Sequence, residues 1–141
     1  MVRRTLAEIE NGITKMRLAT RDLMLADTEL QKHTAIVQNQ NAQNEVELGF
    51  ETVKSLYLGP KSDIESAYST FKRWVDARKL NEELAYAGNI NEVQKRLAPG
   101  GEVAVVRDEL LRKVQLISDF AKRKSIQLYQ NSKDTYNELV I

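Results

Sequence analysis

The chain contains no cysteine, only two prolines and six glycines, and few aromatic residues (6%). Without cysteine it has no disulfide framework, no thiolate metal site and no cysteine nucleophile. Scarce proline and glycine leave long stretches without a helix breaker, which favours long helices. Lysine and arginine (21) nearly balance aspartate and glutamate (20), so no bulk charge draws the chain to nucleic acid or anionic lipid.

Long hydrophobic runs are also missing from the 141 residues. A membrane-spanning helix needs about 18 or more predominantly apolar residues, so we expect no membrane span. The segment from Met1 to Glu10 mixes basic and acidic residues without an apolar run, unlike a secretory signal. These features predict a cytoplasmic protein. A virion-associated protein, or one exported without a cleaved signal, would have the same features.

Helical periodicity begins near the N-terminus. Thr5 and Glu8 have the spacing of a capping box, in which each side chain satisfies a free backbone amide at a helix start. From Ile9 to Val37 an apolar residue recurs every seven positions, and no proline interrupts the stretch. This seam predicts one long helix over residues 5–58, of the kind found in coiled coils.

A polar run at residues 38–44, rich in asparagine and glutamine, interrupts the seam. Asparagine is a poor helix former because its side chain competes for backbone hydrogen bonds, so the run is a candidate kink. We favour a continuous helix, since the run contains no glycine or proline and apolar spacing resumes at Val46. A break there would instead produce two shorter helices and a four-helix domain.

Three more helices are predicted after a stop signal at Gly59–Pro60. They are expected over residues 62–87, 90–97 and 102–140. Leu128 and Leu139 fall on the inner stripe of the last one. Its first residues, 102–106, have strand propensity, but no second strand exists for them to pair with. We therefore predict one all-α domain over residues 1–141, an elongated antiparallel three-helix bundle or coiled coil with a long N-terminal helix.

The predicted helices differ in length. At 1.5 Å per residue the first spans roughly 80 Å and the later arms roughly 55–60 Å, so residues 5–20 project beyond the bundle and Ile141 ends near Gly59. An apolar stripe without intramolecular cover needs a partner. If the helices slide or bend, the same stripe becomes ordinary core. The candidate protein interface consists of Leu6, Ile9, Ile13, Met16 and Leu23.

Basic residues beside aromatic ones form a second candidate site. Proteins that bind single-stranded nucleic acid combine a basic groove with aromatic side chains on which bases stack. Acidic neighbours dilute both basic clusters, so this site is not favoured over the protein interface. The candidate contacts are Lys72, Arg73, Arg78, Lys79, Lys122, Arg123 and Lys124.

The sequence shows no catalytic or metal-binding constellation. His33 is the only histidine, and Glu29 one turn earlier adds a single ligand, whereas a zinc site takes about three or four. The adjacent carboxylates Glu82 and Glu83 point apart on a helix, whereas acid–base chemistry needs two groups that face each other. The glycines at 100–101 lack the following lysine of a phosphate-binding loop. We expect no cofactor and no enzymatic activity.

These patterns favour a non-enzymatic protein that works by assembly. Through its N-terminal stripe it would form a homo-oligomer or dock onto a larger complex, as a virion or secretion-machine component, scaffold, adaptor or chaperone. On this hypothesis, replacing Ile9 and Ile13 with aspartate dissociates an oligomer. The alternative is an accessory protein on single-stranded nucleic acid, which would bind through its basic helix faces.

Overall fold

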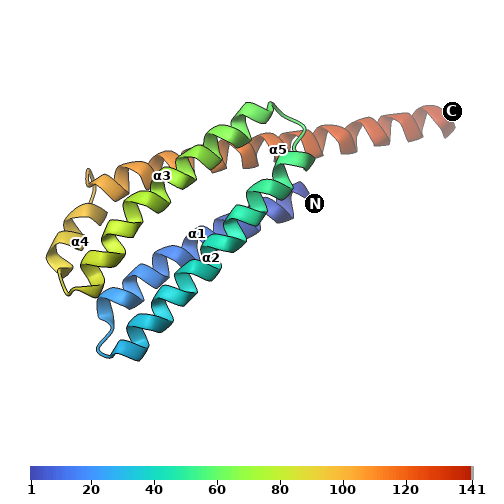
Figure 1. Cartoon of the computed structure of the whole chain (residues 1–141). Coiled ribbons are helices and arrows are strands. Elements are labelled where there is room, and N and C mark those ends of the chain that lie inside the picture. Colours follow the sequence, from blue (N-terminus) through green and yellow to red (C-terminus); the bar gives the residue numbers. More distant parts are fainter. Residues whose placement is uncertain (141) are drawn as a thin grey trace.

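The computed structural model describes the backbone of residues 1–140 and the side chains of residues 1–139, and this part of the chain is helical without strands. Figure 1 shows one antiparallel hairpin of α1 and α2, and a second pair formed by α3 and α5, with the short α4 between them. The all-α prediction is confirmed, and the packing resembles a bundle. The helices are α1 (Val2–Leu25), α2 (Glu29–Leu56), α3 (Lys61–Tyr86), α4 (Ile90–Leu97) and α5 (Glu102–Val140).

The predicted single helix over residues 5–58 is wrong, because the chain turns at residues 26–28. Thr28 Oγ1 accepts a hydrogen bond from the Gln31 backbone amide at 3.1 Å, and Gln31 Oε1 accepts one from the Thr28 amide at 3.3 Å. This reciprocal capping box starts α2 without any glycine or proline. The polar run at 38–44 is helical throughout, so the break lies earlier than the candidate kink.

The other helix boundaries need smaller corrections. Thr5 does not cap α1, which already begins at Val2, and its hydroxyl instead donates to the Met1 carbonyl oxygen at 3.1 Å. The bounds of α3, α4 and α5 lie within one residue of the expected ranges. With α1 and α2 separate, four long helices pack together where three were expected.

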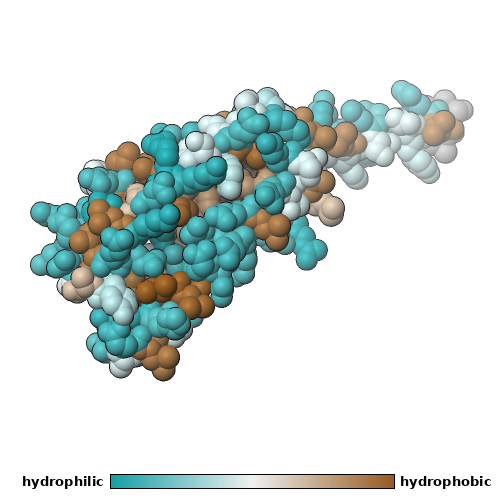
Figure 2. Space-filling model, in the orientation of Figure 1, coloured by the Kyte–Doolittle hydropathy of each residue, from teal (hydrophilic) through white to brown (hydrophobic). Residues whose placement is uncertain are grey.

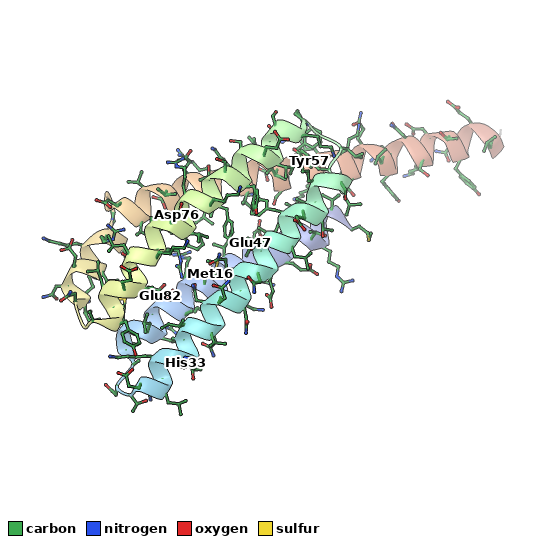
Figure 3. All side chains as sticks on the ribbon, in the orientation of Figure 1. Met16, His33, Glu47, Tyr57, Asp76 and Glu82 are labelled. Carbon is green, nitrogen blue, oxygen red and sulfur yellow. The ribbon has the colours of Figure 1, made fainter. Side chains whose placement is uncertain are left out.

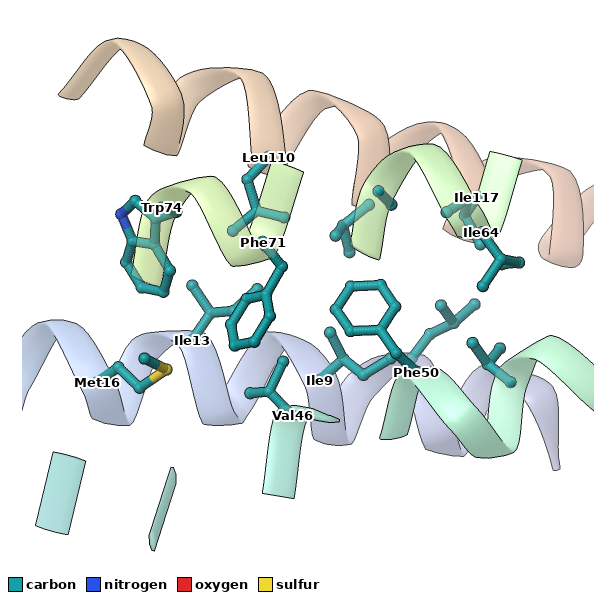
Figure 4. Packing of buried hydrophobic residues seen from close by; sticks show 14 of the residues in the cluster. Ile9, Ile13, Met16, Val46, Phe50, Ile64, Phe71, Trp74, Leu110 and Ile117 are labelled. Atoms are coloured by element: carbon teal, nitrogen blue, oxygen red, sulfur yellow. The ribbon is translucent and has the colours of Figure 1, made fainter. Parts of the chain in front are cut away.

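The core lies between the two helix pairs. Figure 4 shows Ile9 and Ile13 of α1 facing aromatic side chains from α2 and α3. The ring centroid of Phe71 lies 5.7 Å from that of Phe50 and 6.1 Å from that of Trp74. Burial of such large side chains is the main stabilising contribution in a helical domain. Fully buried residues include Ile9, Ile13, Met16, Val46, Val53, Ile64, Phe71, Trp74, Leu110 and Ile117.

Two glycines allow α1 and α2 to approach closely. A Cβ atom at Gly12 would lie 2.4 Å from Val46 Cγ2, and one at Gly49 would lie 2.6 Å from Ile9 Cγ1. Neither space admits even a methyl group, so the missing side chains let each helix receive a branched side chain of the other. The hairpin therefore depends on sequence features that its heptad seam does not reveal.

A buried arginine fixes α4 against its neighbours. Arg96 Nε donates to Asn81 Oδ1 at 2.6 Å, Nη2 donates to the Ala77 carbonyl oxygen at 2.9 Å, and Nη1 donates to Glu102 Oε2 at 2.6 Å. These bonds join α4 to α3 and to the first residue of α5. The start of α5 is thereby fixed at the end of the bundle where α3, α4 and α5 meet.

The helices do differ in length, but the overhang belongs to α5. Its last buried residue is Ala121, and the rings of Phe120 and Tyr57 meet at 5.2 Å where α2 ends. Beyond this level residues 122–140, here called the α5 arm, project from the bundle (Figure 1). At 1.5 Å per residue the arm is about 28 Å long. Ile141, expected near Gly59, lies outside the described residues.

Candidate functional site

The stripe predicted as an exposed interface is buried inside the molecule. Each of its residues is at most 4% exposed, because α2 doubles back at residues 26–28 and covers the face that one long helix would have left open. The expectation of an uncovered N-terminal stripe is therefore wrong, and the alternative of an intramolecular core is the one observed. The residues concerned are Leu6, Ile9, Ile13 and Met16 in the main cluster and Leu23 in a smaller one.

Exposed apolar surface lies instead on the α5 arm. Leu128 follows the buried Ala121 by seven residues, and Leu139 follows Leu128 by eleven, spacings that return to the same face of an α-helix. Tyr129 and Tyr136, also seven apart, form the adjoining row. Leu128 is 50% exposed and Leu139 82% exposed. In Figure 2 this projecting part is mostly hydrophilic (teal to white), with apolar side chains (brown) near its base and near its far end.

The arm thus continues a stripe that the bundle covers only over its first half. In the bundle, Leu110, Val114, Ile117 and Ala121 of α5 are buried, and α5 packs against α3 and α1 there. Past Ala121 no described side chain of α5 is buried. An amphipathic helix normally buries its apolar face against another element. The arm lacks that element within the part of the chain that the structure describes.

A cleft of about 390 Å³ opens where the arm leaves the bundle. The start of α1, the end of α2 and the α5 segment around Phe120 and Leu128 line it, with Lys124 among the polar lining residues. Burial, followed by the nearby Asp63 carboxylate, raises the pKa of Tyr57 to about 12, so this phenol stays neutral at physiological pH. The cleft is therefore a largely apolar hollow beside the apolar stripe of the arm.

The basic candidates on α3 are engaged in contacts within the chain. Arg73 pairs with Glu109 at 3.1 Å, and Lys79 pairs with Asp76 at 3.6 Å. Lys72 lies over the Tyr68 ring, 4.6 Å from its centroid. Partnered bases of this kind remain exposed, but part of their charge is already compensated.

Arg78 is not a surface residue at all. Its side chain is buried, and Nη2 donates to the Met16 carbonyl oxygen at 2.5 Å and to Asn39 Oδ1 at 2.7 Å. The expectation that Arg78 contacts nucleic acid is therefore wrong, because its guanidinium faces the interior. It holds three helices together, since Met16, Asn39 and Arg78 belong to α1, α2 and α3.

The third group of basic candidates, Lys122, Arg123 and Lys124, lies at the start of the arm. Glu109, the partner of Arg73, lies earlier on α5, and these residues follow it by 13 or more positions. They therefore lie about 20 Å or more from Glu109 along the helix. The two basic clusters therefore do not form one continuous groove along the helix. With Arg78 buried as well, the residues proposed to contact nucleic acid are not brought together.

Titratable groups elsewhere are dispersed. His33 is exposed on α2, and Figure 3 shows it well separated from Asp76 on another helix. Among the described side chains, no group of three histidines or carboxylates could hold a metal ion. Burial raises the pKa of Glu82, while the Arg78 guanidinium opposes the rise, so this carboxyl belongs to the buried arginine network. None of these groups forms a facing acid–base pair.

Comparisons with protein-family models, curated proteins and solved structures found no match. Within residues 1–140, no helix combines the length and the apolar character that crossing a bilayer requires. The candidate interaction site of the described chain is the α5 arm together with the cleft at its base. Sequence periodicity alone identifies its stripe, but not that the stripe is uncovered.

Proposed function

We propose that this chain is a non-enzymatic assembly protein and that two copies associate through their α5 arms. The observation that supports the proposal is the single stripe of α5, which is buried as far as Ala121 and exposed at Leu128 and Leu139. Most of the stability of a protein helix comes from tertiary packing of its apolar face, which the arm lacks among the described residues. A second arm packed on this stripe would provide those contacts.

The charges on the arm favour an antiparallel arrangement of the two copies. Lys122, Arg123 and Lys124 make its start basic, while Asp134 and Glu138, together with Lys133, leave its end weakly acidic. In an antiparallel pair the basic start of each arm lies beside the acidic end of the other. A parallel pair would instead place three positive charges beside three positive charges, which is repulsive.

The cleft at the base of the arm supports the same arrangement. When two arms overlap fully in opposite directions, residue 139 of one copy lies level with residue 123 of the other. Leu139 and Tyr136 of the second copy would then approach the cleft near Tyr57 and Phe120. Large side chains seated in apolar pockets are the contacts that contribute most to protein interfaces.

Such a dimer would carry one bundle at each end of a central helix pair. This geometry suits proteins that hold two partners at a defined separation or that build a larger array. A scaffold, an adaptor, a chaperone and a component of a virion or secretion machine all have this requirement. The proposal covers the mode of assembly, which these roles share.

Aspartate at Leu128 and Leu139 should abolish self-association. Each substitution places a carboxylate in the apolar seam, where it must lose its hydration. We expect the wild-type protein to reach twice the chain mass in light scattering as its concentration rises, and the double variant to stay monomeric with unchanged helical circular dichroism. The matched control is Leu48→Asp, an exposed leucine on α2, which should still dimerise. A wild type that is monomeric at every concentration would contradict the proposal.

Charge reversal tests the antiparallel orientation. Replacing Lys122, Arg123 and Lys124 with glutamate should weaken the dimer about tenfold at low salt, because Asp134 and Glu138 can form at most two ion pairs at each end of the antiparallel pair, each contributing roughly 0.2–1 kcal/mol. Adding Asp134→Lys and Glu138→Lys to the same chain should restore the affinity. High salt should reduce both effects through screening. A parallel dimer would be little affected by the first change, since like charges would face each other before and after it.

A further inference from the structure

A second cleft, of about 350 Å³, lies between α1 and the beginning of α5, at the end of the bundle opposite the arm. Its volume is in the range of small-molecule binding sites, about 300–1,000 Å³. The cleft combines an apolar floor with a concentration of positive charge. Its apolar lining includes Trp74, Met24, Leu97 and Val103, and its cationic lining consists of Arg17, Arg21, Arg78 and Arg107.

The positive charges around this cleft are poorly compensated. Arg17 forms no ion pair with any side chain among residues 1–139. The carboxylate nearest to Arg21 is Asp22, its neighbour in the chain, at 3.4 Å, and Arg107 likewise contacts only the adjacent Asp108, at 3.1 Å. Such exposed pairs neutralise little charge. The cleft therefore keeps a positive potential that favours an anion.

The buried arginine in the cleft wall experiences this potential. Burial lowers the pKa of Arg78 to about 10, and although the Glu82 carboxylate opposes this shift, the charge of Arg17 adds to it. Arg17 and Arg78 are thus close enough to repel each other. An anion placed between the arginines would relieve that repulsion.

Two buried N–H groups in the same wall have no acceptor. Neither the indole Nε1 of Trp74 nor Nε of Arg78 has a hydrogen-bond partner among the described residues. More than about nine in ten buried polar groups in folded proteins are hydrogen-bonded, so two unsatisfied donors beside one cleft are unusual. These two atoms are closed to solvent, so an anion in the cleft would pair with the arginines at the rim.

We propose that this cleft binds a small amphipathic anion, a carboxylate or phosphate monoester attached to an apolar tail. Arg17, Arg21 and Arg107 would hold the charged group, because planar guanidinium groups recognise carboxylate and phosphate oxygens with paired hydrogen bonds. The tail would lie on Met24 and Leu97, the partly exposed apolar lining residues, whereas Trp74 is buried in the wall. The site is formed by one chain and lies away from the arm, so it is independent of the proposed dimer.

Trp74 is the only tryptophan in the chain and lines the cleft, so its fluorescence reports on occupancy. The full chain is titrated, below micelle-forming concentrations, with octanoate, octyl phosphate, octanol and inorganic phosphate. We expect a saturable change with octanoate or octyl phosphate, at least tenfold tighter than with octanol or inorganic phosphate. The difference between the two tailed anions identifies the preferred charged group. Failure of both to saturate would overturn the proposal, as would octanol binding as tightly as octanoate.

Variants at the rim test which residues hold the anion. Arg17→Gln combined with Arg107→Gln should weaken binding about tenfold or more, because hydrogen bonds to charged groups are removed. Arg112→Gln, an exposed arginine of α5 outside the cleft, is the matched control and should leave binding unchanged. Thermal unfolding of each variant verifies that the fold is retained. Undiminished binding in the folded double variant would overturn the assignment.

Discussion

Replacing Ile9 and Ile13 with aspartate should unfold the chain and should not yield a folded monomer. The two side chains are 0% and 1% exposed, and they pack in the main core against the residues shown in Figure 4. The cluster itself is apolar, and the buried Arg78 guanidinium beside it is already bonded to the Met16 carbonyl oxygen and Asn39. An unpaired buried charge costs several kcal/mol, and two of them approach the whole stability of a domain, about 5–15 kcal/mol.

Circular dichroism and urea unfolding measure this effect directly. The aspartate variant should lose its cooperative transition, whereas the pair Ile9→Val and Ile13→Val should remain folded and lose about 0.5–1.5 kcal/mol per site. A folded aspartate variant with native helical signal would show that this stripe is exposed. The same result would restore the interpretation in which these residues form an intermolecular interface.

The two outcomes differ in what covers the stripe, and sequence periodicity does not predict that. The heptad pattern correctly identifies the inner face of α1, because burial follows the helical repeat. It does not identify what covers that face, since a stripe packed on its own chain and one packed on a partner have the same pattern. Leu30 and Val37 continue the heptad in sequence but are 75% and 42% exposed in α2.

The turn at residues 26–28 determines the architecture, and the sequence contains a local signal for this turn. Thr28 and Gln31 have the spacing of a capping box, which is as strong a start signal as Thr5 and Glu8, yet only the former is used. The absence of glycine and proline concealed the break. A capping signal inside an uninterrupted apolar pattern therefore deserves as much weight as a helix breaker.

The helices differ in length as predicted, but the longest one is α5 and not the N-terminal helix. Once residues 1–56 fold into a hairpin, α2 is 28 residues long and α3 is 26, whereas α5 has 39. The overhang must then belong to α5. Spacing alone places Leu128 and Leu139 on the inner stripe of α5, and they are exposed because the bundle ends before them.

The arginine-lined cleft could not be predicted from spacing. Its cationic residues come from three helices, at Arg17 and Arg21, at Arg78 and at Arg107, and no motif joins them in the sequence. The sequence does not distinguish Arg78 from its exposed neighbours, because burial of an arginine depends on acceptors from distant segments. Those acceptors, the Met16 carbonyl and Asn39, come from α1 and α2.

Removal of the Arg78 guanidinium should destabilise the fold more than loss of any exposed charge. The group donates to α1 and α2 and lies over the Trp74 ring at 4.5 Å. Arg78→Ala leaves the Met16 carbonyl and Asn39 without this donor and leaves Glu82 without its nearby cation. Loss of one partner from a buried charged network costs about 3–5 kcal/mol. Arg112→Ala, at an exposed position of α5, should change stability by less than about 0.5 kcal/mol.

The pH dependence of that loss distinguishes the charge from simple packing. Burial already raises the pKa of Glu82, and Arg78 opposes the rise, so Arg78→Ala should raise this pKa further. A carboxyl whose pKa is higher in the folded state binds an extra proton there, and its stabilising effect is lost as pH rises through that pKa. The stability deficit of Arg78→Ala, measured by urea unfolding against wild type, should therefore be larger at pH 8 than at pH 4.5. An equal deficit at both values would mean that lost packing on Trp74, and not an uncompensated carboxylate, accounts for the destabilisation.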